Sequence, residues 1–367
     1  MTVKKMSVFN ISIENVNITL ETESVHDIHF KNGTHYVSDL YEVPLLLIII
    51  LSCCYGLISV LSVVGNFSVI VIVALSRRMQ NVTNYFIANL AVADMIIGMF
   101  VIPFHFQAAL LQRWVLPPFM CAFCPFVQVL SVNVSVFSLA AIALDRYRAV
   151  MHPLKAKTTK LRAKWIVLFI WIFSALISVP YAVALRVTMV FDSDTGTVSK
   201  PFCNNVGIPG ETWKIYNHIL VFLQYIVPLF LISLVYIAIG LKLKATKTPG
   251  NGEEARDYAI LKNRKKVIHM MFIVVTLFAV CWLPLQLYNA FQEIMPQINR
   301  YRYINVIWFC CHWLAMSNSC YNPFIYAIYN EKFNSEFRNR LGRCINIFRE
   351  PQQNVTSITD TFSSRYA

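Results

Sequence analysis

The chain alternates long apolar segments with short polar ones. Residues 43–76 contain no Asp, Glu, Lys or Arg, and they include an unbroken run of Leu and Ile from Leu45 to Leu51. A helix needs about 20 such residues to cross the ~30 Å hydrocarbon core of a bilayer. Six further segments have the same character, which makes seven in all: 84–111, 118–144, 165–185, 214–241, 267–292 and 303–329.

These segments are expected to be helices, because every backbone polar group in lipid must be paired within its own segment. Several contain proline, which membrane helices tolerate as a kink. The sequence therefore predicts an all-α membrane protein, a seven-transmembrane helix bundle with a short amphipathic surface helix after the seventh span. The predicted divisions are a tail at 1–43, the bundle at 44–329, the surface helix at 330–344 and a second tail at 345–367.

The composition agrees with a chain that is solvated largely by lipid. Of its 367 residues, 57% are apolar and 14% are charged, whereas soluble domains carry about 25% charged residues. This excludes a disordered chain, a small disulfide-stabilised domain and an ordinary cytosolic enzyme. The net charge of +13 suits either nucleic acid or a membrane surface, and the positions of the charges decide between the two.

The basic residues gather on one side of the predicted bundle. If residues 1–43 lie outside the cell, the inner segments hold 23 basic and 8 acidic residues, and the outer segments hold 9 and 10. This is the asymmetry of the positive-inside rule, so the charge sets the topology and is no nucleic-acid signature. We expect a multi-pass plasma-membrane protein with an extracellular N-terminus and a cytoplasmic C-terminus. The inner segments are 77–83, 145–164, 242–266 and 330–367.

The first tail carries glycosylation sequons, which are useful only in the secretory lumen. It contains no apolar signal segment, so the first span is expected to act as the insertion signal. Other sequons, such as those at Asn66, Asn81 and Asn354, fall in lipid or cytosol and are interpreted as chance matches. The expected glycosylation sites are Asn10, Asn17 and Asn32.

Most of the ten cysteines lie inside spans, where a thiol behaves as a small apolar group. Cys121, at the outer end of the third span, and Cys203, in the outer loop before the fifth, lie in oxidising surroundings and could meet. Closing that 82-residue loop would stabilise the outer face by roughly 4–5 kcal/mol. Cys121 and Cys124 also form a C-x-x-C pair, but one turn of an apolar helix separates them, which disfavours a redox motif.

Asp94 is the one charged residue in the interior of the second to seventh spans. A carboxylate in hydrocarbon is costly unless it is paired, so it indicates a functional site. Hydroxyls and amides around a carboxylate suit a small cation such as sodium. A protonated Asp acting as a hydrogen-bonded strut is the alternative, and the sequence leaves both open. The expected sodium ligands are Asp94, Ser135, Asn318 and Asn322.

Three short motifs lie deep in the bundle or at its inner end. Asp145-Arg146-Tyr147 closes the third span, where the Arg can swing between a carboxylate and a docked partner. Trp282 with Pro284 in the sixth span, and Asn322-Pro323 with Tyr326 in the seventh, combine a proline hinge with polar or aromatic side chains. Such helices favour a bistable bundle, in which a ligand biases one arrangement over another.

The segment after the seventh span is amphipathic. Phe333, Phe337 and Leu341 recur at i, i+4 and i+8 with charges between them, which predicts a helix on the inner membrane surface. Cys344 just beyond is a candidate for palmitoylation, and an unmodified thiol is the alternative. The Ser- and Thr-rich last fifteen residues are typical of a phosphorylation cluster, although plain disorder would have the same composition.

Together these motifs resemble the rhodopsin-like (class A) G-protein-coupled receptors. The resemblance covers about 45–345. It implies a Cys121–Cys203 bridge, an extracellular agonist, and a cytoplasmic G-protein site opened by outward movement of the sixth helix. One departure is the basic run at 262–266, where many relatives carry an acidic residue that restrains Arg146; here that restraint must come mainly from Asp145. The positions that carry the resemblance are Asn66, Asp94, Asp145-Arg146-Tyr147, Trp171, Pro228, Tyr236, Cys281-Trp282-Leu283-Pro284, Asn322-Pro323 and Tyr326.

The resemblance also narrows the ligand. Amine receptors carry an Asp where this chain has Gln128, and opsins carry a Lys in the seventh span, which this chain lacks. A neutral and aromatic pocket suits an amidated peptide with aromatic side chains. The expected pocket residues are Phe104, His105, Gln128, Gln286, Asn289, Trp308 and His312.

The segments 121–135, 282–289 and 313–323, with the inner loop from Thr248 to Asn263, look like the invertebrate leucokinin (myokinin) receptors. This resemblance implies short amidated peptides as ligands, Gq-class signalling to phospholipase C and calcium, and arrestin and receptor kinase as partners of the tail. Tachykinin-like, neuropeptide Y-like and RYamide receptors are the alternatives. A transporter or channel is less consistent, because no internal repeat is visible. The chain shows no nucleophile–base or metal-ligand spacing of an enzyme.

Overall fold

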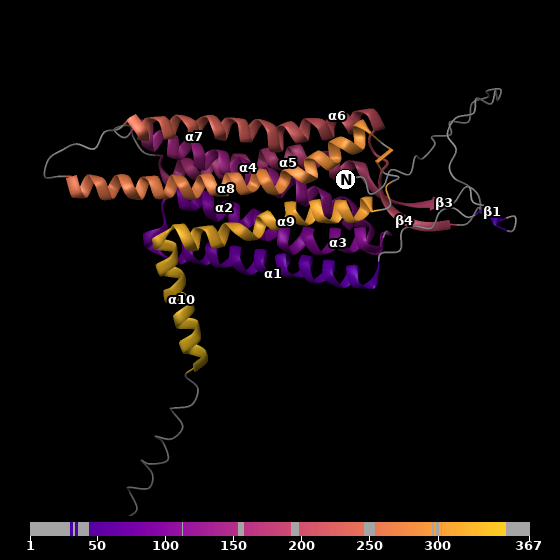
Figure 1. Cartoon of the computed structure of the whole chain (residues 1–367), viewed down its shortest axis with the longest axis horizontal. Coiled ribbons are helices and arrows are strands. Elements are labelled where there is room, and N and C mark those ends of the chain that lie inside the picture. The colour runs from indigo at the N-terminus through magenta and orange to yellow at the C-terminus, as the bar shows by residue number, and fades with distance from the viewer. Residues whose placement is uncertain are drawn as a thin grey trace, which may run out of the picture.

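The computed structural model describes residues 30–31, 34–35, 44–111, 113–152, 158–191, 198–245, 254–295, 297–298, 301 and 303–349. The expected glycosylation sites Asn10, Asn17 and Asn32 lie outside the described residues, as does the Ser/Thr-rich end of the tail. The described part of the chain is mostly helical, and its long helices run side by side in one bundle (Figure 1).

The predicted helical bundle is confirmed. Four of its members are single helices, α1 (Leu45–Leu75), α4 (Pro118–Met151), α5 (Lys160–Ala184) and α8 (Glu254–Ile294). Two are broken by a π-turn: α2 (Val82–Ile96), η2 (Ile97–Val101) and α3 (Ile102–Leu111); α6 (Gly210–Val221), η3 (Phe222–Ile226) and α7 (Val227–Ala245). The seventh is α9 (Ile304–Tyr329), and α10 (Glu331–Arg349) follows it.

Six of the seven bundle members are long and apolar enough to cross a membrane. The seventh, α9, also has no Asp, Glu, Lys or Arg, but its Asn, Ser and His side chains make it more polar. It packs between α8 and α1, so its polar groups face neighbouring helices (Figure 1). Buried partners of this kind let a span carry amide and hydroxyl groups that lipid alone would disfavour.

The prolines act as the sequence predicts, within helices and not at their ends. Pro180, Pro284 and Pro323 each lie inside a continuous helix. The π-turns η2 and η3 end two residues before Pro103 and Pro228. A proline lacks an N–H and its ring clashes with the carbonyl four residues earlier. A wider π-turn at that point accommodates both effects.

The helices at the centre of the bundle approach one another closely. α4 packs against α2, α5 and α7, and Asn89 joins three of these helices by donating to Ser138 (2.8 Å) and accepting from Trp171 Nε1 (2.8 Å). Between α1 and α9, a Cβ on Gly65 would lie 3.0 Å from the Pro323 ring. Glycine therefore permits the close contact of these two helices beside the seventh-span proline.

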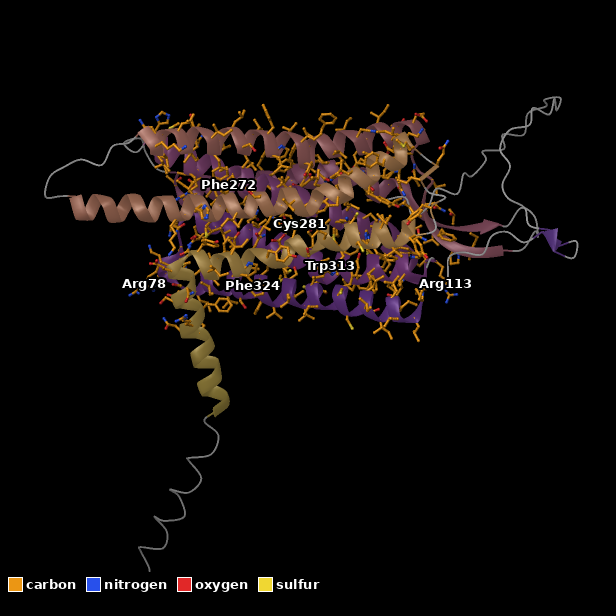
Figure 2. The ribbon with its side chains drawn as sticks, viewed as in Figure 1. Arg78, Arg113, Phe272, Cys281, Trp313 and Phe324 are labelled. Carbon is orange, nitrogen blue, oxygen red and sulfur yellow. A yellow bond between two sulfur atoms is a disulfide. The ribbon has the colours of Figure 1, made fainter. Side chains whose placement is uncertain are left out.

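The two ends of the bundle differ. At the hairpin end, strands β3 (Leu185–Phe191) and β4 (Val198–Asn205) form an antiparallel ribbon that projects beyond the helices (Figure 1). A second, minimal pair joins β1 (Phe30–Lys31) to β2 (Thr34–His35). At the α10 end, η1 (Arg77–Met79) connects α1 to α2, and α10 runs across the bundle axis. Figure 2 shows Arg113 at the hairpin end and Arg78 at the α10 end.

Two element boundaries differ from the sequence expectation. α8 begins at Glu254, well before the apolar segment that starts near residue 267, because the intervening Ala, Leu, Lys and Arg residues are good helix formers outside lipid as well. α10 continues to Arg349, beyond the expected limit of 344. Cys344 lies on this helix, but its side chain is outside the described residues.

Candidate functional site

A disulfide fixes the outer rim of a pocket at the hairpin end. Cys121 at the start of α4 is bonded to Cys203 on β4, with their Cα atoms 5.5 Å apart, so the bridge expected from the sequence is confirmed. The backbone N–H of Trp114, which follows α3, donates to the Pro201 carbonyl of β4 (2.7 Å) and so provides a second attachment for this strand. These contacts hold β4 over the ends of α3 and α4.

The pocket beneath this strand is small, with a volume of about 60 Å³. Aromatic and aliphatic side chains make most of its wall, and Arg113 contributes a cation at the mouth. His105 contributes an imidazole from α3. Its lining is completed by Ala108, Ala109, Trp114, Pro125, Leu185, Phe202, Cys203, Asn204 and Trp308.

A buried hydrogen-bond chain lies beside this pocket. The Tyr55 hydroxyl donates to the Phe309 carbonyl oxygen (2.9 Å), and it lies 3.0 Å from Nδ1 of His312. Because the tyrosine hydrogen is already used, Nδ1 of His312 must be the donor in the second contact. The other ring nitrogen, Nε2, is then an acceptor, and it is buried without a hydrogen-bond partner in the described part of the chain.

Stacked rings hold the two histidines together. His312 stacks on Trp308 with ring centroids 4.7 Å apart and faces His105 at 6.3 Å. On the other side Tyr55 stacks on Phe106 at 4.4 Å. Nδ1 of His105 is also buried and has no partner among the described residues. Buried polar atoms are nearly always paired, so two unpaired imidazole nitrogens indicate a place where a ligand completes the pairing.

The structure brings together part of the predicted ligand set. His105 and Trp308 line the pocket and His312 stacks beneath Trp308. Phe104 is partly buried against the cluster around Trp114 and the disulfide. Gln128 and Gln286 are half-buried and Asn289 is exposed. Ligand contact stays a prediction for all seven.

The sequence reasoning missed several residues of this site. Tyr55 looks like core packing in a mostly apolar span, although it is the single tyrosine of that span, which was a usable signal. Arg113, Phe202 and Asn204 lie in connecting segments, whose positions depend on the hairpin and the disulfide. The side chains expected from the sequence implied a neutral pocket wall. Arg113 shows that the wall also carries a positive charge.

A polar network fills the middle of the bundle around Asp94. Its carboxylate accepts from Asn322 Nδ2 (2.7 Å) and from the Ser135 hydroxyl (3.4 Å), and it is almost completely buried. The Ser319 side chain is a further partner. Asn318, which was expected here, is buried but has no described hydrogen bond to this carboxylate. The network joins α2, α4 and α9.

A second network closes the α10 end. Arg146 pairs with Asp145 (2.6 Å) and also donates to the Thr83 hydroxyl, which in turn donates to Asp145 (3.0 Å). The side chains of 262–265, in the basic run at the start of the sixth span, are outside the described residues. The next residue, Lys266, pairs with Glu331 of α10 at 2.7 Å. Within the described chain, the hydrogen-bond partners of Arg146 are thus on α2 and on its own helix.

The remaining aromatic motif residues lie in or against the main core of the bundle. Tyr236, Tyr326 and Trp282 are buried, and their hydroxyl or indole N–H groups have no partner among the described residues. Tyr326 contacts the Phe333 ring of α10 with centroids 5.7 Å apart. Tyr147 packs against the main core. Buried polar groups without partners favour a second packing of these helices in which the groups form hydrogen bonds.

Comparison with known proteins bears on this arrangement. Residues 65–326 match the family described as 7 transmembrane receptor (rhodopsin family). The chain is 32% identical to the RYamide receptor of Tribolium castaneum over 332 residues, which are 88% of this chain and 86% of that protein. It is 34% identical to Neuropeptide receptor 22 of Caenorhabditis elegans over 334 residues, covering 85% and 74%. Tachykinin-like peptides receptor 99D of Drosophila melanogaster is 32% identical over 319 residues, covering 85% and 61%.

Proposed function

Because the chain belongs to the rhodopsin family of seven-transmembrane receptors, we propose that it is a receptor for an amidated neuropeptide of the leucokinin (myokinin) type. It is a receptor and not an enzyme. The named relatives are receptors for RYamide and tachykinin-like peptides and a neuropeptide receptor, which supports a peptide ligand. The choice of a leucokinin rests on the sequence resemblance described above.

The observation that carries the proposal is the unpaired acceptor Nε2 of His312. A C-terminal carboxamide has two N–H donors and one carbonyl acceptor. Its N–H groups pair with the free imidazole nitrogens of His312 and His105, and its carbonyl is free to accept from Arg113. A free carboxylate has no hydrogen to offer the imidazole lone pair, so this chemistry selects an amide over an acid.

The size of the pocket sets which part of the peptide enters. A volume of about 60 Å³ is a few times the roughly 10–15 Å³ that a cavity needs in order to hold one water molecule. The terminal amide fits with little rearrangement, whereas an aromatic side chain requires Trp308 or Phe202 to shift. The rest of the peptide lies over the hairpin, where the exposed Met189 side chain offers apolar surface.

The RYamide peptides are the second candidate. The RYamide receptor of Tribolium castaneum covers 88% of this chain at 32% identity. A pocket lined by imidazole and indole groups also suits an amidated peptide with an aromatic end. The two candidates differ in the side chains next to the amide, which meet the hairpin residues Phe202 and Asn204.

Signalling follows from the two networks beneath the pocket. Agonist contact with Trp308 and His312 on α9 changes the hydrogen bond between Asp94 and Asn322 and shifts α8, which carries Trp282. The α10 end of the bundle then opens to a heterotrimeric G protein. We assign the Gq class, acting through phospholipase C and calcium. A sodium ion beside Asp94 would hold the resting arrangement, since the carboxylate and the nearby hydroxyls of Ser135 and Ser319 are oxygen ligands that suit a hard cation.

The orientation and modifications follow the same proposal. The hairpin end faces outward and the α10 end faces the cytoplasm of a plasma-membrane protein, in line with the positive-inside rule. Asn10, Asn17 and Asn32 carry glycans, and Cys344 carries a palmitoyl chain that anchors α10. The tail recruits receptor kinase and arrestin.

Calcium imaging of cells that express the full chain tests the ligand. Separate cultures receive a kinin, a tachykinin and an RYamide peptide, and cells without the chain receive the same peptides. A calcium rise to the kinin at the lowest concentration supports the proposal. Silence to the kinin with a response to another peptide overturns the ligand choice, and ion flux independent of any G protein would contradict receptor signalling itself.

A further inference from the structure

A groove runs between α7 and α8 at the α10 end, away from the peptide pocket. Its volume is about 550 Å³, and it is lined by Tyr236, Leu243, Lys266, Ile268, His269 and Phe272. Figure 2 shows Phe272 on the side of α8 that faces α7. The groove exists because α8 packs mainly against α9 and has little contact with α7.

The floor and sides of the groove are apolar. Leu243 and Ile268 are half-buried, and Phe272 is 53% exposed even though its ring meets Tyr236 edge to face, with centroids 6.4 Å apart. The neighbouring surface of α7 is also apolar, because Ile237 and Leu241 are exposed. A groove with such walls, open toward the bilayer, takes a hydrocarbon chain without loss of hydrogen bonds.

The rim at the α10 end is basic. Lys266 and His269 lie one turn apart at the start of the sixth span, and Lys242 and Lys244 occupy the last turn of α7. No acidic residue is among the described groove-lining side chains. Basic residues that frame an apolar gap between helices on the cytoplasmic side recognise lipid phosphates.

We propose that an anionic glycerophospholipid of the cytoplasmic leaflet binds in this α7–α8 groove. Its phosphate lies between Lys266 and His269, and an acyl chain follows Leu243, Ile268 and Phe272. A zwitterionic phosphocholine lipid brings its own cation to this basic rim, so the groove favours a headgroup with net negative charge. This site is separate from the peptide pocket, but it shares Tyr236 with the motif residues of the bundle.

The lipid competes with an ion pair inside the protein. Lys266 is held by Glu331 of α10 at 2.7 Å, but the two side chains are 41% and 79% exposed. Exposed ion pairs contribute little net stability, so a phosphate near Lys266 can replace the carboxylate. When the lipid binds, Lys266 of α8 exchanges its ion pair with Glu331 of α10 for one with the lipid phosphate.

Photocrosslinking of the full-length receptor in phosphatidylcholine nanodiscs tests the site. The probes are phosphatidylserine and phosphatidylcholine with the same diazirine acyl chain, each added at the same trace fraction. Peptide mass spectrometry then counts adducts on 234–243 and 266–272. Phosphatidylserine adducts are expected to exceed phosphatidylcholine adducts there several-fold. Inorganic phosphate added at millimolar concentration is expected to leave them unchanged.

Matched variants separate charge, shape and competition. Lys266→Gln is expected to lower the phosphatidylserine excess about fivefold, the effect of one cation near an anionic surface. Arg78→Gln removes the same charge at the same end of the bundle but outside the groove (Figure 2), and it should leave the excess unchanged. Leu243→Trp, which fills the groove, should reduce adducts of both lipids. Glu331→Gln frees Lys266 and should raise the excess.

Several outcomes would overturn the proposal. Equal labelling of the groove by both lipids would mean that any acyl chain fills it. A loss in Arg78→Gln as large as in Lys266→Gln would mean a diffuse surface effect. Displacement of the phosphatidylserine probe by inorganic phosphate would mean that the headgroup alone binds.

Discussion

Nδ1 of His312 lies 3.0 Å from the Tyr55 hydroxyl, whose own hydrogen is directed to the Phe309 carbonyl oxygen. This relationship sets the tautomer of a histidine on α9 from a residue on α1. It leaves Nε2 of His312 as an acceptor beside the candidate peptide pocket. The proposed recognition of a terminal amide therefore depends on a tyrosine that is not itself expected to touch the ligand.

Tyr55→Phe is expected to weaken agonist potency about fivefold. The variant keeps the ring and its stack on Phe106 but removes the hydroxyl that fixes the His312 tautomer, at a cost near the ~1 kcal/mol of one hydrogen bond. Calcium dose–response curves at matched surface expression measure the shift. The control is Tyr216→Phe, whose hydroxyl donates to the Ile177 carbonyl outside the pocket (2.7 Å). Equal potency of the two variants would argue against the tautomer role.

Cys203→Ala is expected to abolish peptide binding and to lower surface expression. The bond to Cys121 closes an 82-residue separation, and its loss removes roughly 4–5 kcal/mol of chain-entropy stabilisation. Saturation binding and surface labelling measure the two effects. Cys124→Ala is the control, because that free, buried thiol lies one turn further along α4. If both variants bind alike, the hairpin does not depend on its bridge.

Thr83→Val is expected to raise basal signalling a few-fold. Its hydroxyl donates to Asp145 and accepts from Arg146, and the loss of about 1 kcal/mol from the resting state shifts a two-state equilibrium about fivefold. Inositol phosphate accumulation without agonist measures this change. Thr159→Val serves for comparison, since that hydroxyl only caps α5. Unaltered basal activity would mean that Arg146 is restrained elsewhere.

Asp94→Asn is expected to make agonist affinity insensitive to sodium. The carboxylate that accepts from Asn322 and Ser135 is the proposed anionic ligand, and an amide has no charge to attract the cation. Radioligand competition in sodium chloride and in choline chloride measures the difference. Ser178→Ala, which removes a buried hydroxyl bonded within its own helix (2.7 Å), should keep the wild-type response. A sodium effect that survives in Asp94→Asn would favour the hydrogen-bonded strut.

The sequence was enough to predict the helices, because each lipid-spanning helix contains a long apolar run with at most one charged residue, such as 43–76. It was enough for the link between Asp94 and Asn322 too, since a charge in the bundle interior has few polar partners to choose from. The early start of α8 at Glu254 was not predicted. Hydropathy marks where lipid begins, and a helix is free to continue into water.

The pocket was predicted only in part, and the reason is spatial. His105 and His312 stand out as polar residues in apolar spans, but Tyr55 is 257 positions from its partner His312. Neither the tautomer nor the stack on Trp308 can be derived from spacing along one helix. The β3–β4 hairpin was also missed. Its register, with Val187 opposite Cys203, is what brings Phe202 and Asn204 over the pocket.

The ratio of potencies of one kinin peptide as its C-terminal amide and as its free acid tests the central claim most directly. Wild type and His312→Phe are compared in calcium assays of cells that express the full chain at equal surface levels. The account predicts a strong preference of the wild type for the amide, and a preference reduced about tenfold in His312→Phe, which keeps an aromatic ring but has no acceptor. Equal potency of amide and acid on the wild type, or an undiminished preference in His312→Phe, would contradict it.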